Sequence, residues 1–266
     1  DTGGAERIES AEYLRVYTQE VAAAACYLFN DVEMDLSAKM LNETVTGFDK
    51  HLDALLNGNE ALGIIGGEQK RKTIAKLEEI KTSWAPISTA AQALLEDPEN
   101  RDAVAVIKAG NMPLFEKTHI LVSDMEAEYS NPAELMQSDV ITLEIVGRQA
   151  MMSQKIAKYA CQIFTGDTSE QVLKGFRDSI GLYEISLDAL INGMPQVGIQ
   201  PAPTSEIATS LTDVLEDWKE MRPALDALLE GQASSRDQQV SLYTHMVDEM
   251  HKLEEIAHLY VEYSKH

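Results

Sequence analysis

The sequence predicts an all-α protein made of two tandem up-down four-helix bundles. Three observations support this fold class. Apolar residues recur at helical spacing, as in Leu52, Leu55 and Leu56. Proline and glycine gather at the boundaries between such segments, and one long stretch of sequence occurs twice. No stretch has the convincing alternation of apolar and polar residues that is typical of a β-strand.

The repeated stretch is long and aligns without a gap. The segment CYLFNDVEMDLSAKMLNETVTGFDKHLDALLNG begins at Cys26, and CQIFTGDTSEQVLKGFRDSIGLYEISLDALING begins at Cys161. The offset of 135 residues is kept from this first pair to the last pair, Gly58 and Gly193. A period of this length indicates a whole duplicated domain, because solenoid repeats are much shorter.

The repeat continues beyond this stretch and defines the domain organisation. Trp84 aligns with Trp218, and each is expected in the core of its own bundle. We therefore expect two domains related by the internal repeat, residues 1–130 and residues 131–266. A duplication of this kind places the two bundles side by side like a fused dimer.

Local signals mark where the helices begin and end. The runs Asp97-Pro98-Glu99 and Asn131-Pro132-Ala133-Glu134 each place a capping side chain before proline and an acid. Gly58 and Gly193 stand where C-terminal caps belong. The expected helices cover residues 6–30, 34–57, 67–96, 98–128, 133–165, 168–192, 204–230 and 234–264, with long loops at 58–66 and 193–203.

Composition excludes several classes of function. The chain has 22 Lys and Arg against 44 Asp and Glu, a net charge of −22, so nucleic acid and anionic lipid would be repelled. No apolar run is long enough to span a bilayer, so a membrane enters the argument only if the chain is a receptor ectodomain. The sequence lacks a glycine-rich phosphate loop, a nucleophile elbow and a metalloprotease histidine pair. We expect a non-enzymatic protein without a cofactor.

The two cysteines leave two interpretations open. Cys26 and Cys161 are equivalent positions of the repeat, and they are the only cysteines in the chain. They are either two buried core thiols or a single disulfide bond that joins the two copies. The bond would suit an oxidising compartment.

A motif in the fifth expected helix carries a family resemblance. The run GRQAMMSQKIAKYA begins at Gly147 and resembles the signature of the PilJ-type sensor domain, approximately G-R-Q-R-M-x-S-Q-x-x-A-K. The second arginine of the pattern is missing, because that position is Ala150. In the first copy the equivalent helix has Arg15 opposite Ala150 but Tyr13 opposite Arg148. Between them the two copies hold one full set of the signature arginines.

The resemblance implies a function and a location. PilJ-type domains lie at the extracytoplasmic, often periplasmic, end of type IV pilus chemotaxis transducers. They and the similar nitrate-sensing ectodomains are four-helix bundles that pair as dimers, with a small anion held by arginines where the first helices meet. The resemblance therefore implies a sensory, signal-transducing protein that binds a small anion, nitrate-like or a carboxylate, between the first helices of the two repeats. It also implies a receptor or signalling partner.

The residues themselves are compatible with an anion site. The stretch from Ile145 to Gln162 contains Arg148, Lys155 and Lys158 but no acid, and it forms a positive island in an acidic chain. A guanidinium group donates two parallel hydrogen bonds to a flat oxyanion. The candidate ligand-binding residues are Arg148, Gln149, Met152, Ser153 and Lys155 in the second copy and Arg15, Thr18 and Gln19 in the first.

Two other functions compete with this reading. Histidine and methionine are soft ligands that suit copper, and the last helix contains His245, Met246, Met250 and His251. The Glu-x-x-His matches at residues 116–119 and 255–258 raise iron, although they are not equivalent positions of the repeat. The remaining alternative is a protein-interaction module without a ligand.

Overall fold

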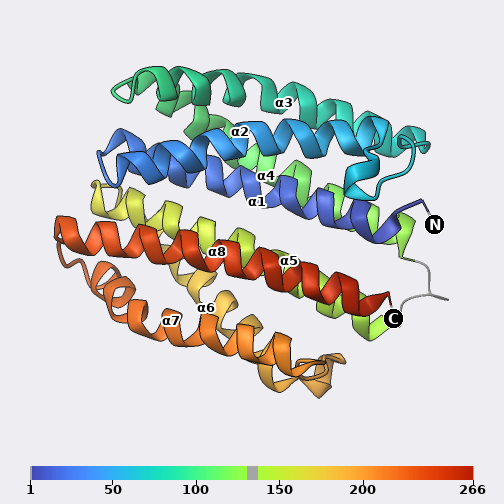
Figure 1. The fold of residues 1–266 in the computed structure, drawn as a ribbon. Coiled ribbons are helices and arrows are strands. Elements are labelled where there is room, and N and C mark those ends of the chain that lie inside the picture. Colours follow the sequence, from blue (N-terminus) through green and yellow to red (C-terminus); the bar gives the residue numbers. More distant parts are fainter. Residues whose placement is uncertain (1, 131–136, 266) are drawn as a thin grey trace. The chain divides into compact units, whose positions relative to one another are not determined.

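The computed structural model describes residues 2–130 and 137–265. In these residues the chain forms eight α-helices and two short 3-10 helices, and its only β-type pairings are two isolated bridges (Figure 1). The predicted all-α class is therefore confirmed. The chain divides into two compact units, residues 1–134 and residues 135–266, and each unit is described by itself.

The first unit is a four-helix bundle. Its helices are α1 (Gly4–Phe29), α2 (Met34–Asn57), α3 (Arg71–Glu96) and α4 (Arg101–Tyr129). α1 packs against α2 and α4, and α3 packs against the same two helices from the other side. Neighbours in sequence are therefore neighbours in space, as in an up-down bundle with short connections.

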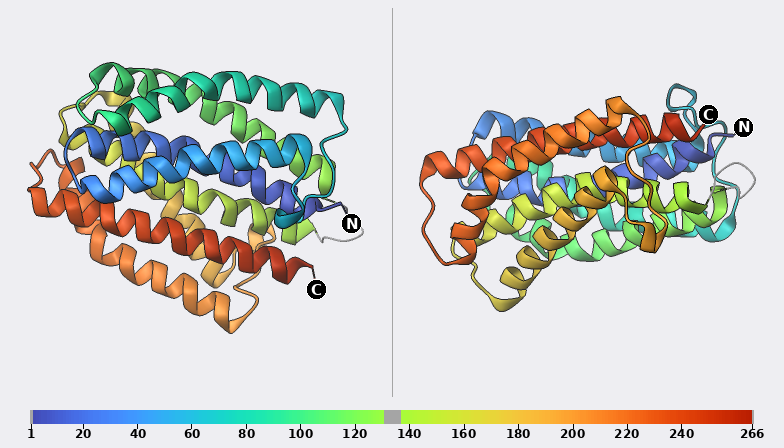
Figure 2. Two further views of the ribbon diagram at one scale, coloured as in Figure 1. Left: turned by 45° about the horizontal axis from the view of Figure 1, so that its top comes forward. Right: turned by 90° about the horizontal axis from the view of Figure 1, so that it is seen from below.

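The second unit repeats this arrangement. Its helices are α5 (Gln137–Phe164), α6 (Glu170–Asn192), α7 (Ser205–Leu229) and α8 (Arg236–Ser264). α5 packs against α6 and α8, while α7 packs against α6 and α8. Both views of Figure 2 show the helices of each unit running alongside one another.

One expected helix start is wrong. α4 begins at Arg101, where the side chain of Asn100 accepts a hydrogen bond from the backbone N–H of Ala103 at 3.0 Å. Asp97 ends α3 instead, and its carboxylate accepts from the N–H of Glu99 at 3.1 Å in a local turn. The capping role belongs to the residue whose side chain reaches the third N–H of the helix. The second expected cap, at residues 131–134, lies outside the described residues.

The two long loops have the same internal structure. In each loop a short 3-10 helix, Glu60–Leu62 or Pro195–Val197, is enclosed by an isolated bridge. The bridges join Asn59 to Ile64 and Met194 to Ile199, at the same offset of 135 residues. The turn requires a left-handed backbone at its last residue, and glycine stands there in both loops.

The tryptophans lie in the cores of their units, which confirms the prediction. Trp84 is 2% exposed and Trp218 is 1% exposed. The indole N–H of Trp84 donates to Oδ1 of Asp49 at 2.9 Å, and that of Trp218 donates to Oε2 of Glu184 at 3.2 Å. A ring from the second helix of the bundle packs on each indole, with 4.0 Å between centroids for Phe48 and Trp84. Each unit thus satisfies its buried indole by the same device.

The cysteines are oxidised. Neither Cys26 nor Cys161 is a free thiol, and both are disulfide-bonded. The interpretation of the two residues as buried core thiols is therefore wrong.

Candidate functional site

The cationic candidates of the second unit lie on α5. Arg148, Met152 and Lys155 are four and three residues apart, so the helix places them on one face. Met152 is buried, while Arg148 and Lys155 are partly exposed. Nε of Arg148 lies 3.2 Å from Oε1 of Glu144, one turn earlier in the helix. The positive charge of Arg148 is therefore partly balanced by an acid just outside the acid-free stretch.

The lysines of α5 are held in a desolvated environment. Burial lowers the pKa of Lys155. Lys158 is 4% exposed, and burial together with the positive charge of Lys155 lowers its pKa to about 7. Its ammonium group lies 4.5 Å from the centroid of the Tyr159 ring. Near neutral pH this helix therefore carries a buried lysine that is readily protonated or deprotonated.

Sequence reasoning placed Lys158 in the positive island but left it out of the expected ligand-binding set. Its burial depends on what packs against α5, and helix spacing alone does not give that information. The family signature, which includes a lysine at this position, was the signal available in the sequence.

Three of the neutral candidates are engaged within their own bundle. Gln149 donates from Nε2 to the backbone oxygen of Tyr183 in α6 at 3.2 Å. The hydroxyl of Ser153 donates to the backbone oxygen of Ala150 at 2.6 Å. The hydroxyl of Thr18 does the same to the backbone oxygen of its own α1 helix, three residues earlier, at 2.7 Å. The polar hydrogens of these side chains are used in packing each helix.

The first-unit candidates lie in the interior of α1. Arg15 is fully buried, and its Nη1 donates to Nδ1 of His119 in α4 at 3.1 Å. Gln19 is also buried, and its Nε2 donates to the hydroxyl of Thr18 at 3.3 Å. Asn111 of α4 donates to the backbone oxygen of Thr18. The structure thus brings Arg15, Thr18 and Gln19 together around the contact of α1 with α4.

Buried amide oxygens recur among these residues. The side-chain oxygens of Gln19, Gln149 and Gln154 are buried and accept no hydrogen bond in the described part of the chain. A buried acceptor without a donor costs free energy, so each is a place where a water molecule or a ligand group with a hydrogen is favoured. Gln154 was absent from the expected set, although its Nε2 donates to the backbone oxygen of Met246 at 3.2 Å.

The structure does not bring the metal-ligand candidates of the last helix to one point. Met246 and Met250 lie in the core of the second unit, while His251 is exposed. Nδ1 of His245 lies 2.8 Å from the backbone oxygen of Ser241 in its own helix. In the described residues no group of three or more histidine, cysteine or acidic side chains is placed to hold a metal ion.

A buried carboxyl group in α8 was missed by the sequence reasoning. Glu249 is fully buried, and burial raises its pKa to about 8, with a further contribution from the negative charge of Asp217. The hydroxyl of Tyr183 acts in the opposite sense. The available signal was position, because Glu249 stands directly beside Met250 and three residues after Met246 in the apolar stripe of its helix.

The comparison with known families bears on the second unit. Residues 136–244 match the family model PilJ, described as the N-terminal region of the type IV pili methyl-accepting chemotaxis transducer. The chain carries a PilJ-type domain. The match runs from the start of α5 into α8, so the kinship of the first unit rests on the internal repeat alone. No curated protein matches the chain.

The PilJ-type domain fixes the broad class of function. The family is sensory and non-catalytic, and its members are the N-terminal domains of chemotaxis transducers. Such domains are typically extracytoplasmic. None of the helices in the described part of the chain is long and apolar enough to cross a membrane.

Proposed function

We propose that this chain is an extracytoplasmic sensory protein that binds a small anion and passes the signal to a receptor or signalling partner. The observation that carries the proposal is the PilJ-type domain at residues 136–244. The oxidised cysteines support an extracytoplasmic location, because disulfides persist in oxidising compartments. The charges of α5 support the anionic nature of the ligand.

The electrostatic argument rests on the cations of α5. The lowered pKa values of Lys155 and Lys158 mean that their surroundings disfavour the charged form. A bound anion would offset that cost, and Arg148 adds a planar donor suited to nitrate or a carboxylate. Repeat alignment adds Arg15, Thr18 and Gln19 of α1 as the proposed second half of the site, while Gln149, Met152 and Ser153 complete the α5 half.

Calorimetric titration and thermal unfolding with sodium nitrate, formate and acetate, against sodium chloride at equal ionic strength, test the proposal. An anion present at 100 times its dissociation constant is expected to stabilise the folded chain by about 2.7 kcal/mol. Arg148→Ala and Lys158→Met are expected to weaken that anion by about tenfold or more, since a charge-assisted hydrogen bond contributes roughly 1.5–3 kcal/mol. Lys219→Ala, which removes one exposed charge from α7, is the matched control.

The affinity should also depend on pH in one direction. Lys158 is protonated below its pKa of about 7 and neutral above it, so an anion that contacts it is bound more tightly at pH 6 than at pH 8.5. In Lys158→Met this difference should shrink. Binding that is the same in the Lys219→Ala control and in Arg148→Ala would contradict the proposed site. Silence of the whole anion panel would favour an interaction module.

A further inference from the structure

A groove between α2 and α3 of the first unit has the composition of a cation site. It encloses about 400 Å³, a volume within the range of small-molecule pockets. The carboxylates of Asp49 and Asp53 and the apolar side chain of Leu56 line it from α2. Trp84 and Ser88 line it from α3. It therefore offers two negative charges beside an apolar wall.

The carboxylates are held in place from behind. The indole N–H of Trp84 donates to Oδ1 of Asp49 at 2.9 Å, and Phe48 stacks on that indole. Nδ2 of Asn57 donates to Oδ1 of Asp53 at 2.7 Å. In the described residues the second oxygen of each carboxylate accepts no hydrogen bond from the protein. Each carboxylate thus keeps an oriented oxygen for a donor from outside.

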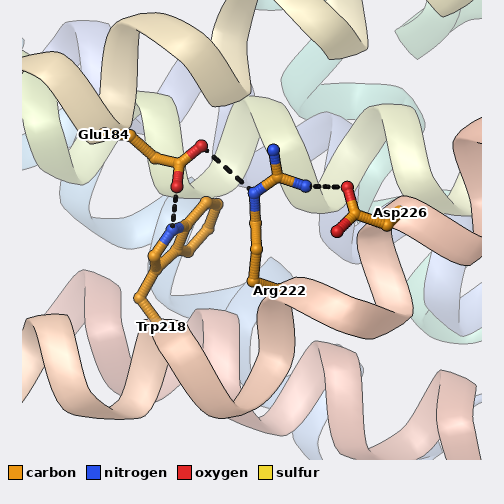
Figure 3. Close-up of polar contacts among 4 residues, drawn as sticks. All are labelled: Glu184, Trp218, Arg222 and Asp226. Atoms are coloured by element: carbon orange, nitrogen blue, oxygen red, sulfur yellow. Dashed lines mark hydrogen bonds and ion pairs between the residues drawn. The ribbon is translucent and has the colours of Figure 1, made fainter.

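The second unit shows what such a place holds when it is filled. There the indole N–H of Trp218 donates to one oxygen of Glu184, and Nε of Arg222 lies 3.1 Å from the other oxygen of the same carboxylate (Figure 3). The guanidinium group also pairs with Asp226. One carboxylate thus receives an indole and a guanidinium, one on each oxygen.

The repeat identifies the residue that makes the difference. Glu184 aligns with Asp49, and Trp218 aligns with Trp84 at an offset of 134 residues. The same offset of 134 aligns Arg222 with Ser88, which lines the groove of the first unit. The indole and the carboxylate are therefore common to both units, while the first unit has a short hydroxyl side chain where the second has a guanidinium.

We propose that the groove of the first unit binds a small organic cation, a guanidinium or primary ammonium compound with a short alkyl chain. The cationic head takes the place that Arg222 fills in the second unit, and the alkyl chain packs on Leu56. The net charge of −22 favours the approach of such a ligand over a long range. Lys81 also lines the groove, and its like charge opposes the ligand. This inference does not depend on the proposed anion site.

Nuclear magnetic resonance of the two indole N–H groups tests the proposal directly. Ethylguanidinium chloride is titrated into the full chain at constant ionic strength, with N-ethylurea as the neutral analogue of similar shape. The signals are assigned with Trp218→Phe. Ethylguanidinium is expected to shift the Trp84 signal with saturation, while the Trp218 signal stays in place and the urea moves neither. Equal shifts with both compounds, or no shift of Trp84, would overturn the proposal.

Two exchanged variants sharpen the test. Ser88→Arg supplies the first unit with its own guanidinium, so ethylguanidinium should bind at least tenfold more weakly. Arg222→Ser should open the equivalent place in the second unit, so that the Trp218 signal now shifts as well. Undiminished binding to a folded Ser88→Arg would contradict the assignment of the groove.

Substitutions at exposed positions decide the question if Ser88→Arg does not fold. Asp49→Asn is expected to weaken ethylguanidinium about fivefold, the range of one solvent-exposed ion pair. Lys81→Ala is expected to strengthen it, because the opposing charge is removed. Binding that is indifferent to both changes would show that the cation does not use this groove.

Discussion

Glu249 is a carboxyl group in the interior of the second unit, and its ionisation is linked to folding. Its pKa of about 8 lies above the value of about 4.3 expected in the unfolded chain, because burial disfavours the charged form. The folded state therefore holds a proton between these two pH values that the unfolded state has released. The stability contributed by this proton is complete below pH 4 and is lost as the pH rises through 8.

Glu249→Gln, which is always neutral, should remove this pH dependence. At pH 5 we expect similar melting temperatures for the variant and the parent protein, because both side chains are then neutral. At pH 9 the variant should be more stable, by about 1.4 kcal/mol for each unit of pKa shift. Thermal unfolding at both pH values measures the difference, with the exposed Glu255→Gln as a control. An equal effect of Glu249→Gln at the two pH values would contradict the assignment.

At the residue scale the sequence is informative where one helix decides the outcome. The burial of Trp84 and Trp218 follows from helical spacing and residue type. The pairing of Arg148 with Glu144 is also visible in the sequence as a spacing of four residues. The burial of Lys158 and Glu249 depends on which side chains the neighbouring helices present, and a spacing rule for one helix does not contain that information.

At the scale of the elements, the first long loop is fastened to α1 by one side chain. Nη2 of Arg7 donates to the backbone oxygens of Ile65 and Gly66 at 2.9 and 2.8 Å, and its guanidinium lies 5.3 Å from the centroid of the Tyr129 ring. The equivalent position of the second unit is Thr142, and the second loop contains three prolines that the first loop lacks. Proline limits the freedom of the unfolded loop, so the two copies fix the same connection by different means.

Arg7→Met should therefore destabilise the first unit. Two buried carbonyl groups lose a charged donor, and we expect a loss of about 1–3 kcal/mol in the free energy of unfolding. Urea unfolding measures the loss, and Arg177→Met, at an exposed position of α6, serves as the matched control. An effect of Arg7→Met no larger than that of the control would show that the loop does not depend on this clamp.

Most helix bounds could be predicted, and the misplaced starts share one cause. α2 begins and ends as expected, because Gly58 supplies a clear C-terminal cap. α3 begins at Arg71 rather than residue 67, where the carboxylate of Glu68 accepts from the N–H groups of Gln69 and Lys70. Competing capping side chains lie close together before α3 and α4, and only the folded geometry decides which one reaches the helix.

At the scale of the whole molecule, the cysteines link the duplication to the redox environment. Because the chain has two cysteines, at equivalent positions of the repeat, the expected bond joins the two copies within one chain. Digestion without reductant should yield a single crosslinked species that contains Cys26 and Cys161, from a protein of monomeric mass. A disulfide-linked dimer on a non-reducing gel would contradict this expectation.

Cys161→Ser should then lower the free energy of unfolding by about 2–5 kcal/mol, because the crosslink encloses more than 100 residues of the unfolded chain. The parent protein with reductant should show the same loss, and Cys161→Ser should be indifferent to reductant.

The whole-molecule organisation was the most accessible feature of the sequence, and the ligand the least. An exact offset between Cys26 and Cys161 reveals a repeat without any knowledge of packing. The function of Arg148 or Arg15 depends on where each guanidinium points and what balances it, as Glu144 and His119 illustrate. The exchange of Ser88 for Arg222 was present in the alignment, but its meaning required the geometry of the carboxylate between them.

The paired loops have a consequence for the survival of the protein outside a cell. Long connections between helices are the usual points of attack for proteases, which bind an extended and detached stretch of backbone. Here the bridges at Asn59 and Met194 tie each loop to itself, and Ile64 and Ile199 anchor it in the interior. A protease must therefore wait until one end of a bundle opens, so the lifetime of the protein is governed by local unfolding rather than by loop length.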